Sequence, residues 1–268
     1  MLRATRSEFT RLRRRAFGLG WLGISAGLSF LFVTTIFGAA ASGAVIPAAA
    51  PGGAFPSVAD LQAAGGYLAG LPAVSTILGV VTLSFWAFAV ASDYGSGLIR
   101  LLVQAQPSRL ILLGGKVAAL TSMTGIVAAI ATVVVMLASL MTAAPSGIDT
   151  AAWATDLADI VPSAAGSWAS TFLALEIWGV VGLAIATLAR NASVAIAVGA
   201  SYVLIIEGVV RMMAEDVADI LPGATLTAIV SGGTPSIDHA TAITLGVAYA
   251  VVGLVVAGAT LVRRDIVD

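Results

Sequence analysis

Hydrophobic residues follow one another along this chain in long runs, and most charged residues lie in the short segments between them. Leu61–Ser92 is 32 residues long without a charged side chain, and Val117–Ile148 is uncharged as well. A helix needs about 20 apolar residues to cross a bilayer, where its backbone hydrogen bonds must be satisfied within the segment. The pattern therefore predicts six membrane-spanning helices, near Gly18–Gly38, Leu71–Ala91, Val117–Ala143, Trp168–Leu188, Ser193–Val210 and Ala240–Val262.

The composition fits a chain embedded in a membrane. Of the 268 residues, 59% are hydrophobic and only 10% are charged, whereas a soluble domain has about 25% charged residues. No polar stretch is long enough for a second, soluble domain, so we expect residues 1–268 to form a single all-α transmembrane domain. The first window could instead be a secretory signal peptide, but it is longer than the roughly 7–15 apolar residues of such peptides. We therefore expect it to remain as the first span.

Basic residues lie almost entirely on one side of the predicted spans. With the N-terminus inside, the outside holds only Arg211 of the 13 basic residues. The cytoplasmic ones are Arg3, Arg6, Arg11, Arg13, Arg14, Arg15, Arg100, Arg109, Lys116, Arg190, Arg263 and Arg264. This positive-inside pattern predicts that both termini are cytoplasmic. The preference for Arg over Lys, with abundant Ala, Gly and Val, suggests a GC-rich bacterial genome, and hence the bacterial plasma membrane.

Segments outside the spans have helical patterns of their own. In the first fifteen residues, apolar side chains share one face of a helical wheel and arginines lie opposite. This pattern favours an interfacial helix on anionic headgroups over a simple basic flank. Residues 212–237 are too short and acidic to span the bilayer, yet too apolar for a plain loop, so we expect two short outer helices broken at Pro222–Gly223. Residues 149–161 are predicted to form a short helix with Trp153 on its apolar side.

The largest cytoplasmic segment apart from the N-terminus, Asp93–Lys116, reads DYGSGLIRLLVQAQPSRLILLGGK. Leu98, Leu101 and Leu102 form an apolar stripe that predicts a short amphipathic helix. Pro107 ends that helix, because it pushes Gln106 before it away from helical geometry. A helix of this kind, parallel to the membrane surface, is typical of a membrane protein that is driven by a soluble partner.

This loop resembles the first cytoplasmic loop of the membrane subunits of type-2 ABC exporters. Those loops typically carry an acidic residue, often Tyr, then Gly-Thr, paired leucines, and Pro-x-Arg followed by Lys. The residues that match in order and spacing are Asp93, Tyr94, Gly97, Leu101, Leu102, Pro107, Arg109 and Lys116. The chain departs from the family pattern at Asp93, where Glu is usual, and at Leu98, where Thr is usual. The layout of the whole chain is also similar, with a basic N-terminal helix, six spans and a broken outer segment before the last span.

The resemblance implies a permease subunit that pairs with a second permease subunit and docks on a separate ATP-binding subunit. A coupling helix would transmit closure of the ATPase through Asp93, Tyr94, Gly97, Leu98, Leu101, Leu102, Pro107 and Arg109. ATP and magnesium would bind in that partner, and this chain would hold no cofactor and catalyse no reaction. Spans one and five would line the subunit interface. Gly23 and Gly27 give span one a small-xxx-small face, a pattern that serves packing within a chain equally often.

The sequence has no ATPase motif of its own. Gly114–Lys116 lacks the upstream Gly of a P-loop and is followed by Val117 instead of Ser or Thr. The spans offer mainly Ala, Gly and Val, with few aromatic residues and almost no charge. Such a lining suits export of a hydrophobic or amphipathic substrate, such as a drug, an antibiotic or a lipid.

Two glutamates within the predicted spans are candidates for the transport pathway. Glu176 is near the middle of span four, where a charge is costly, so it either lines the pathway or is a protonated packing residue. Glu207 precedes Arg211 by one helical turn near the outer end of span five, and we expect an interfacial ion pair.

His239 is the only histidine and there is no cysteine, which argues against a metal site or a catalytic triad. The alternatives to an exporter subunit are a proton-coupled secondary transporter that uses Glu176 and a non-transporting accessory protein.

Overall fold

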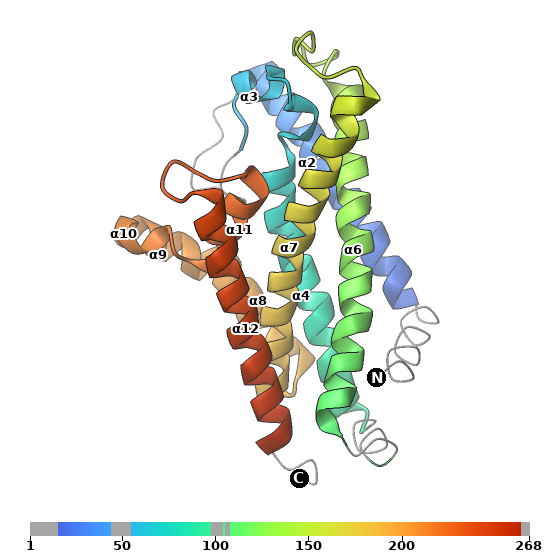
Figure 1. The fold of residues 1–268 in the computed structure, drawn as a ribbon, viewed down its shortest axis with the longest axis vertical. Helices are drawn as coiled ribbons and strands as arrows, with labels where there is room; N and C mark the ends of the chain where they lie inside the picture. Colours follow the sequence, from blue (N-terminus) through green and yellow to red (C-terminus); the bar gives the residue numbers. More distant parts are fainter. Residues whose placement is uncertain (1–15, 44–54, 98–103, 105–107, 264–268) are drawn as a thin grey trace.

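The described part of the chain is built of helices. The computed structural model describes residues 16–43, 55–97, 104 and 108–263, and no β-strand occurs among them. Figure 1 shows the long helices running roughly side by side along the long axis of the molecule. The elements are α2 (Ala16–Ser42), α3 (Val58–Gln62), the 3-10 helix η1 (Gly66–Leu68), α4 (Leu71–Gly95), α6 (Arg109–Thr142), α7 (Leu157–Ala189), α8 (Ala192–Ser201), the π-helix η2 (Tyr202–Ile206), α9 (Glu207–Met213), α10 (Glu215–Ala218), α11 (Pro222–Ser231) and α12 (His239–Arg263).

Among the described residues, six segments are long and apolar enough to cross a membrane, which agrees with the predicted number of spans. They are Phe17–Ser42, Gly66–Gly95, Arg109–Thr142, Leu157–Ala189, Ala192–Val210 and His239–Arg263. The predicted N-terminal interfacial helix lies outside the described residues, and so does nearly all of the predicted coupling helix. Between the fifth and sixth spans the chain forms α10 and α11, and Pro222 occupies the first turn of α11, where its missing N–H costs nothing.

Two helices begin earlier than the hydropathy pattern predicts. The third starts at Arg109 instead of Val117, because Lys116 ends the uncharged run but not the helix, and within α6 its charge is paired with Asp93. The fourth starts at Leu157 instead of Trp168 and contains Pro162 near its first turns. Residues 149–156 form a turn, bends and irregular backbone, so the short helix predicted over residues 149–161 was wrong in its extent.

The helices α4, α6 and α7 form the centre of the bundle. In their most hydrophobic windows 50–56% of the residues are buried, compared with 17–28% in α2, in the α8–η2–α9 segment and in α12. The peripheral helix α2 lies against α6 and α4, and α12 lies mainly against α7. Three of the six spans therefore keep much of their apolar surface free within a single chain.

Glycines allow α4 and α7 to approach closely, and they do so reciprocally. A Cβ added at Gly79 of α4 would lie 2.4 Å from the ring of Trp178 on α7, and one at Gly179 of α7 would lie 2.5 Å from the ring of Trp86 on α4. Both tryptophans are essentially buried, and the indole N–H of Trp86 donates to Thr124 Oγ1 on α6 at 3.1 Å. Each large ring thus fills a space that the opposite helix leaves by lacking a side chain.

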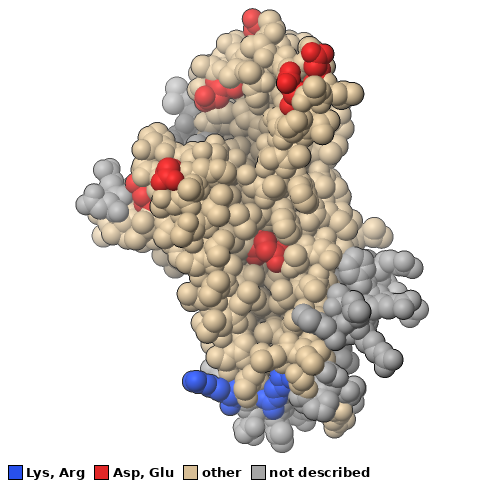
Figure 2. All heavy atoms as spheres, viewed as in Figure 1, with Lys and Arg blue, Asp and Glu red and all other residues tan. Residues whose placement is uncertain are grey.

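The two ends of the molecule differ in charge. Figure 2 shows the basic side chains visible on this face gathered at the lower end, while most acidic ones lie toward the upper end. At the upper end, Trp153 donates its indole N–H to Leu61 O at 2.9 Å. Ser57 caps α3, and its hydroxyl holds the pKa of Asp60 below its ordinary value. At this end, a helix cap and a hydrogen bond from a side chain to the backbone hold the short segments in place, and the basic side chains in Figure 2 lie at the other end.

Candidate functional site

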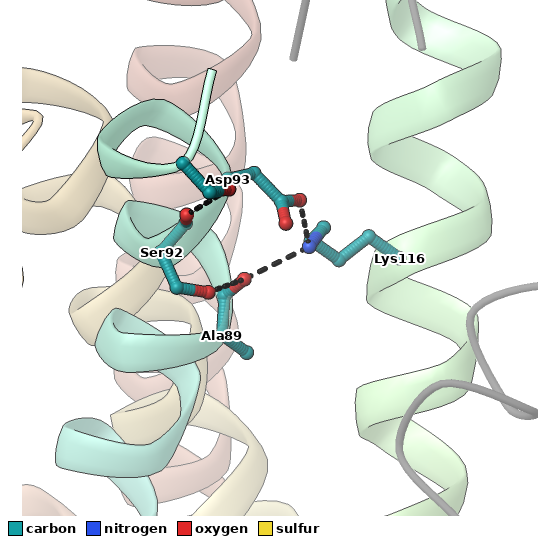
Figure 3. A network of polar contacts seen from close by, with 5 residues as sticks. Ala89, Ser92, Asp93 and Lys116 are labelled. Carbon is teal, nitrogen blue, oxygen red and sulfur yellow. Dashed lines mark hydrogen bonds and ion pairs between the residues drawn. The ribbon is translucent and has the colours of Figure 1, made fainter. Parts of the chain in front are cut away.

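Asp93 and Lys116 join the two helices that flank the predicted coupling loop. Asp93 lies near the end of α4, and Lys116 lies two turns into α6. Lys116 Nζ is 2.5 Å from Asp93 Oδ2 and donates to Ala89 O at 2.9 Å, while Ser92 Oγ also donates to Ala89 O at 3.3 Å (Figure 3). The side chains are only 2% (Asp93) and 12% (Lys116) exposed. An ion pair that is this buried fixes the spacing of α4 and α6 strongly, because either charge alone would be costly there.

Arg109 joins the start of α6 to the end of α12. Its Nη1 donates to Leu261 O at 2.9 Å and lies 3.4 Å from Val262 O. The last carbonyl groups of a helix have no partner within it and carry the negative end of the helix dipole. The guanidinium therefore satisfies one of these carbonyls and places a positive charge where the dipole favours it.

Tyr94 contributes a third connection, to the end of α7. The guanidinium carbon of Arg190 lies 5.6 Å from the centre of the Tyr94 ring, within the range of a cation–π contact. Arg190 follows the last residue of α7 with φ of 52°, the left-handed conformation that ends a helix. Asn191 then caps α8 by accepting from Val194 N–H at 3.1 Å. The turn between α7 and α8 is therefore held against α4.

These contacts, which we call the basic-end cluster, consist of Asp93, Tyr94, Arg109, Lys116 and Arg190. Of the predicted coupling residues, Leu98, Leu101, Leu102 and Pro107 lie outside the described residues. Gly97 is described and has φ of 68°, which favours glycine. Sequence reasoning gave Arg190 no specific role, although a basic residue directly after a hydrophobic run is a signal for a helix-end contact.

Glu207 lies where the fifth span meets the outer helices, and it caps one of them. Its carboxylate accepts from the backbone N–H groups of Gly223 at 3.1 Å and Ala224 at 2.8 Å, at the start of α11. The residue is only 4% exposed, and the π-helix η2 ends directly before it. The predicted pair with Arg211 stays a prediction, since the Arg211 side chain is not among those described. The structure adds a contact that the sequence did not predict.

Glu176 faces α6 from the middle of α7. Thr121 of α6 donates its hydroxyl to Glu176 Oε1, and Oε2 is buried with no hydrogen-bond partner among the described residues. Glu176 and Glu207, the two predicted pathway residues, therefore belong to separate sites on different helices. Within the described residues, no three His, Asp or Glu side chains are grouped so that they could hold a metal ion.

The chain was compared with known proteins by sequence. Neither the models of known protein families nor the curated proteins that were searched gave a match to it.

Proposed function

We propose that this protein is the transmembrane subunit of an ATP-driven exporter of the type-2 ABC class, which uses a separate ATP-binding subunit. The observation that supports this proposal best is the basic-end cluster. Four of the loop residues that match the family pattern, Asp93, Tyr94, Arg109 and Lys116, contact helices that lie apart in the sequence. A loop that only connected two spans would not need such contacts.

The cluster suits the transmission of force. The coupling segment begins directly after α4 and ends directly before α6. Residues at both flanks contact other helices. A push on the segment would move α4 and α6 together through Asp93–Lys116, α7 through Tyr94–Arg190, and α12 through Arg109. In this proposal, closure of an ATPase dimer at the basic end is converted into a concerted shift of four helices.

The same proposal accounts for the charge asymmetry and for the unburied helices. The basic end would face the cytoplasm of a bacterial cell, with both termini on that side. The permease would work as a dimer, and α2 would supply part of the interface. Gly23 and Gly27 are exposed, and a Cβ at either would meet nothing within 4 Å. Their small-xxx-small face is therefore not used for packing among the described residues and is open to another helix.

The substrate would be hydrophobic or amphipathic, such as a drug, an antibiotic or a lipid. The apolar character of the six spans supports this class. A second candidate function, proton-coupled secondary transport, is favoured by one observation only, which is the carboxyl group of Glu176 inside the bundle. That reading requires transport that depends on a proton gradient and is lost in Glu176→Gln.

Purification of the tagged chain from its native host, with identification of copurifying proteins by mass spectrometry, tests the exporter proposal. We expect a soluble ATP-binding subunit to copurify with the wild type and to be lost with Leu101→Asp. Arg263→Asp is the control, because it places the same charge at an exposed position at the same end of the molecule and should keep the partner. Recovery of the wild type without any ATPase, from cells that transport normally, contradicts the proposal.

A further inference from the structure

One face of α7 carries an acid and two aromatic rings in a row. Trp168, Phe172 and Glu176 are spaced by four residues, so they lie above one another on the helix. We call this set the Glu176 stripe. Trp168 is 39% exposed, and Phe172 and Glu176 are half-buried. The stripe thus reaches the outside of the bundle along an apolar span, with Trp168 exposed and Glu176 Oε2 itself buried.

On α6, the charge nearest to the stripe is Lys116, five residues or about 7.5 Å along the helix axis from Thr121, and it is paired with Asp93. The charges on α7 are more distant. Along the helix, Asp159 is about 25 Å away and Arg190 about 21 Å away, at 1.5 Å per residue. Thr121 donates to one oxygen of Glu176, and the other oxygen has no partner among the described residues. One hydroxyl is far too little to solvate a carboxylate in an apolar span, so the group is either neutral by protonation or charged with a cation beside it.

The aromatic half of the stripe is held in place by α6. The rings of Trp168 and Phe172 are stacked, with centroids 5.8 Å apart and an interplanar angle of 8°. Trp168 donates its indole N–H to Gly125 O at 3.1 Å, and the Phe172 ring lies 3.7 Å from the position of a Cβ at Gly125. Aromatic rings attract cations through their faces, most strongly where water is excluded.

We propose that the Glu176 stripe binds a lipophilic cation, an amphipathic molecule with a positive centre and apolar substituents. Glu176 supplies the counter-charge, and Phe172 and Trp168 supply the surface for the apolar substituents. The identification of this cation as cargo rests on the proposed function, whereas the binding itself does not. If this cation is the cargo, the substrate class narrows from hydrophobic or amphipathic molecules in general to positively charged ones.

Charge complementarity argues for this occupant over a second copy of the chain. The basic residues whose side chains are described, Arg109, Lys116, Arg190 and Arg263, lie at the first or last turns of their helices or in the cluster at the basic end. A second copy in the same membrane orientation would place its described cations at that end as well. The cation that comes nearest to the depth of Glu176 would be Lys116, five residues from Thr121 on α6, and it is already paired with Asp93.

Binding of the tetraphenylphosphonium cation to the purified chain, in nanodiscs of uncharged phosphatidylcholine, tests the proposal. Tetraphenylborate is the matched probe, because it has nearly the same size and shape and the opposite charge. We expect equilibrium dialysis to show at least tenfold weaker binding of the cation to Glu176→Gln than to the wild type, and unchanged binding of the anion. Phe172→Leu should weaken cation binding about threefold.

Two further variants separate binding from folding. Glu176→Asp keeps the charge and should retain most of the cation binding, while Asp159→Asn, at the exposed start of the same helix, should leave it unchanged. Equal cation binding by the wild type and Glu176→Gln overturns the proposal, as does equal loss with Asp159→Asn. Because no ATPase takes part, cation binding can fail while an ATP-binding subunit still copurifies, and the reverse can also occur.

Discussion

At the scale of single residues, the ion pair of Asp93 and Lys116 is the most consequential contact of the basic-end cluster. Removing two charges from water costs free energy that their mutual attraction only partly returns. Such a pair therefore contributes less to net stability than its 2.5 Å separation suggests. Its larger effect is on specificity, since any packing of α4 and α6 that separated the two charges would break their contact in a buried position.

Removal of either charge alone should therefore destabilise the protein. We expect Asp93→Asn and Lys116→Met each to lower the free energy of unfolding by about 3 kcal/mol. The double variant should cost less than the sum of the two by about 1–3 kcal/mol, because neither charge is then left behind. Unfolding of the four proteins in mixed micelles, followed by tryptophan fluorescence, measures this coupling.

A control at the same end of the molecule keeps this experiment specific. Arg263→Gln removes an exposed charge in the last turn of α12 and should change the free energy of unfolding by less than about 0.5 kcal/mol. Additive costs of Asp93→Asn and Lys116→Met would contradict the assignment of the pair as a unit.

At the scale of elements, the reciprocal contacts of glycine and tryptophan set the distance between α4 and α7. We expect Gly179→Ala to destabilise the protein by about 1–3 kcal/mol, because the new methyl group would lie 2.5 Å from the buried Trp86 ring. This steric cost should exceed the gain of up to about 1 kcal/mol that alanine brings to a helix interior. The melting temperature of the purified variants in detergent measures the difference.

Gly166→Ala in the same helix is the matched control for Gly179→Ala. A Cβ at Gly166 would meet nothing within 4 Å, so only the gain in helix propensity remains and the melting temperature should stay the same or rise. A lower melting temperature in both variants would show that α7 is sensitive to any substitution, and the close approach to Trp86 would then not be the cause.

The helices themselves could be predicted from the sequence because hydropathy is a local property. The number of spans followed from uninterrupted apolar runs, yet the start of α6 at Arg109 did not, because the uncharged run begins only after Lys116, a residue that α6 contains and that pairs with Asp93 on α4. The cap that Glu207 provides for α11 could not be predicted either, because it depends on the chain turning back so that the backbone N–H groups of Gly223 and Ala224 lie against the carboxylate. Sequence patterns placed residues on helices, and partners from other helices decided what those residues do.

At the scale of the whole molecule, burial is divided unevenly between a central group of helices and a peripheral one. The helices α4, α6 and α7 bury about half of their most hydrophobic windows, while α2 buries 28%. Exposed apolar surface on a span can face lipid at no cost, so exposure alone does not indicate a partner. The exposed small-residue face of α2 is more specific, because close contact between helices in a membrane depends on small residues.

If α2 lines the interface of a permease dimer, bulky residues on its glycine face should separate the subunits without unfolding them. We expect Gly23→Leu/Gly27→Leu to lower the dimeric fraction at least threefold and to leave the melting temperature of the monomer nearly unchanged, since neither position packs against described residues. Photobleaching of single labelled molecules in nanodiscs counts the subunits. Gly166→Leu, equally open but on α7, is the control and should keep the dimer. A double variant that stays dimeric while Gly166→Leu becomes monomeric would move the interface from α2 to the outer half of α7.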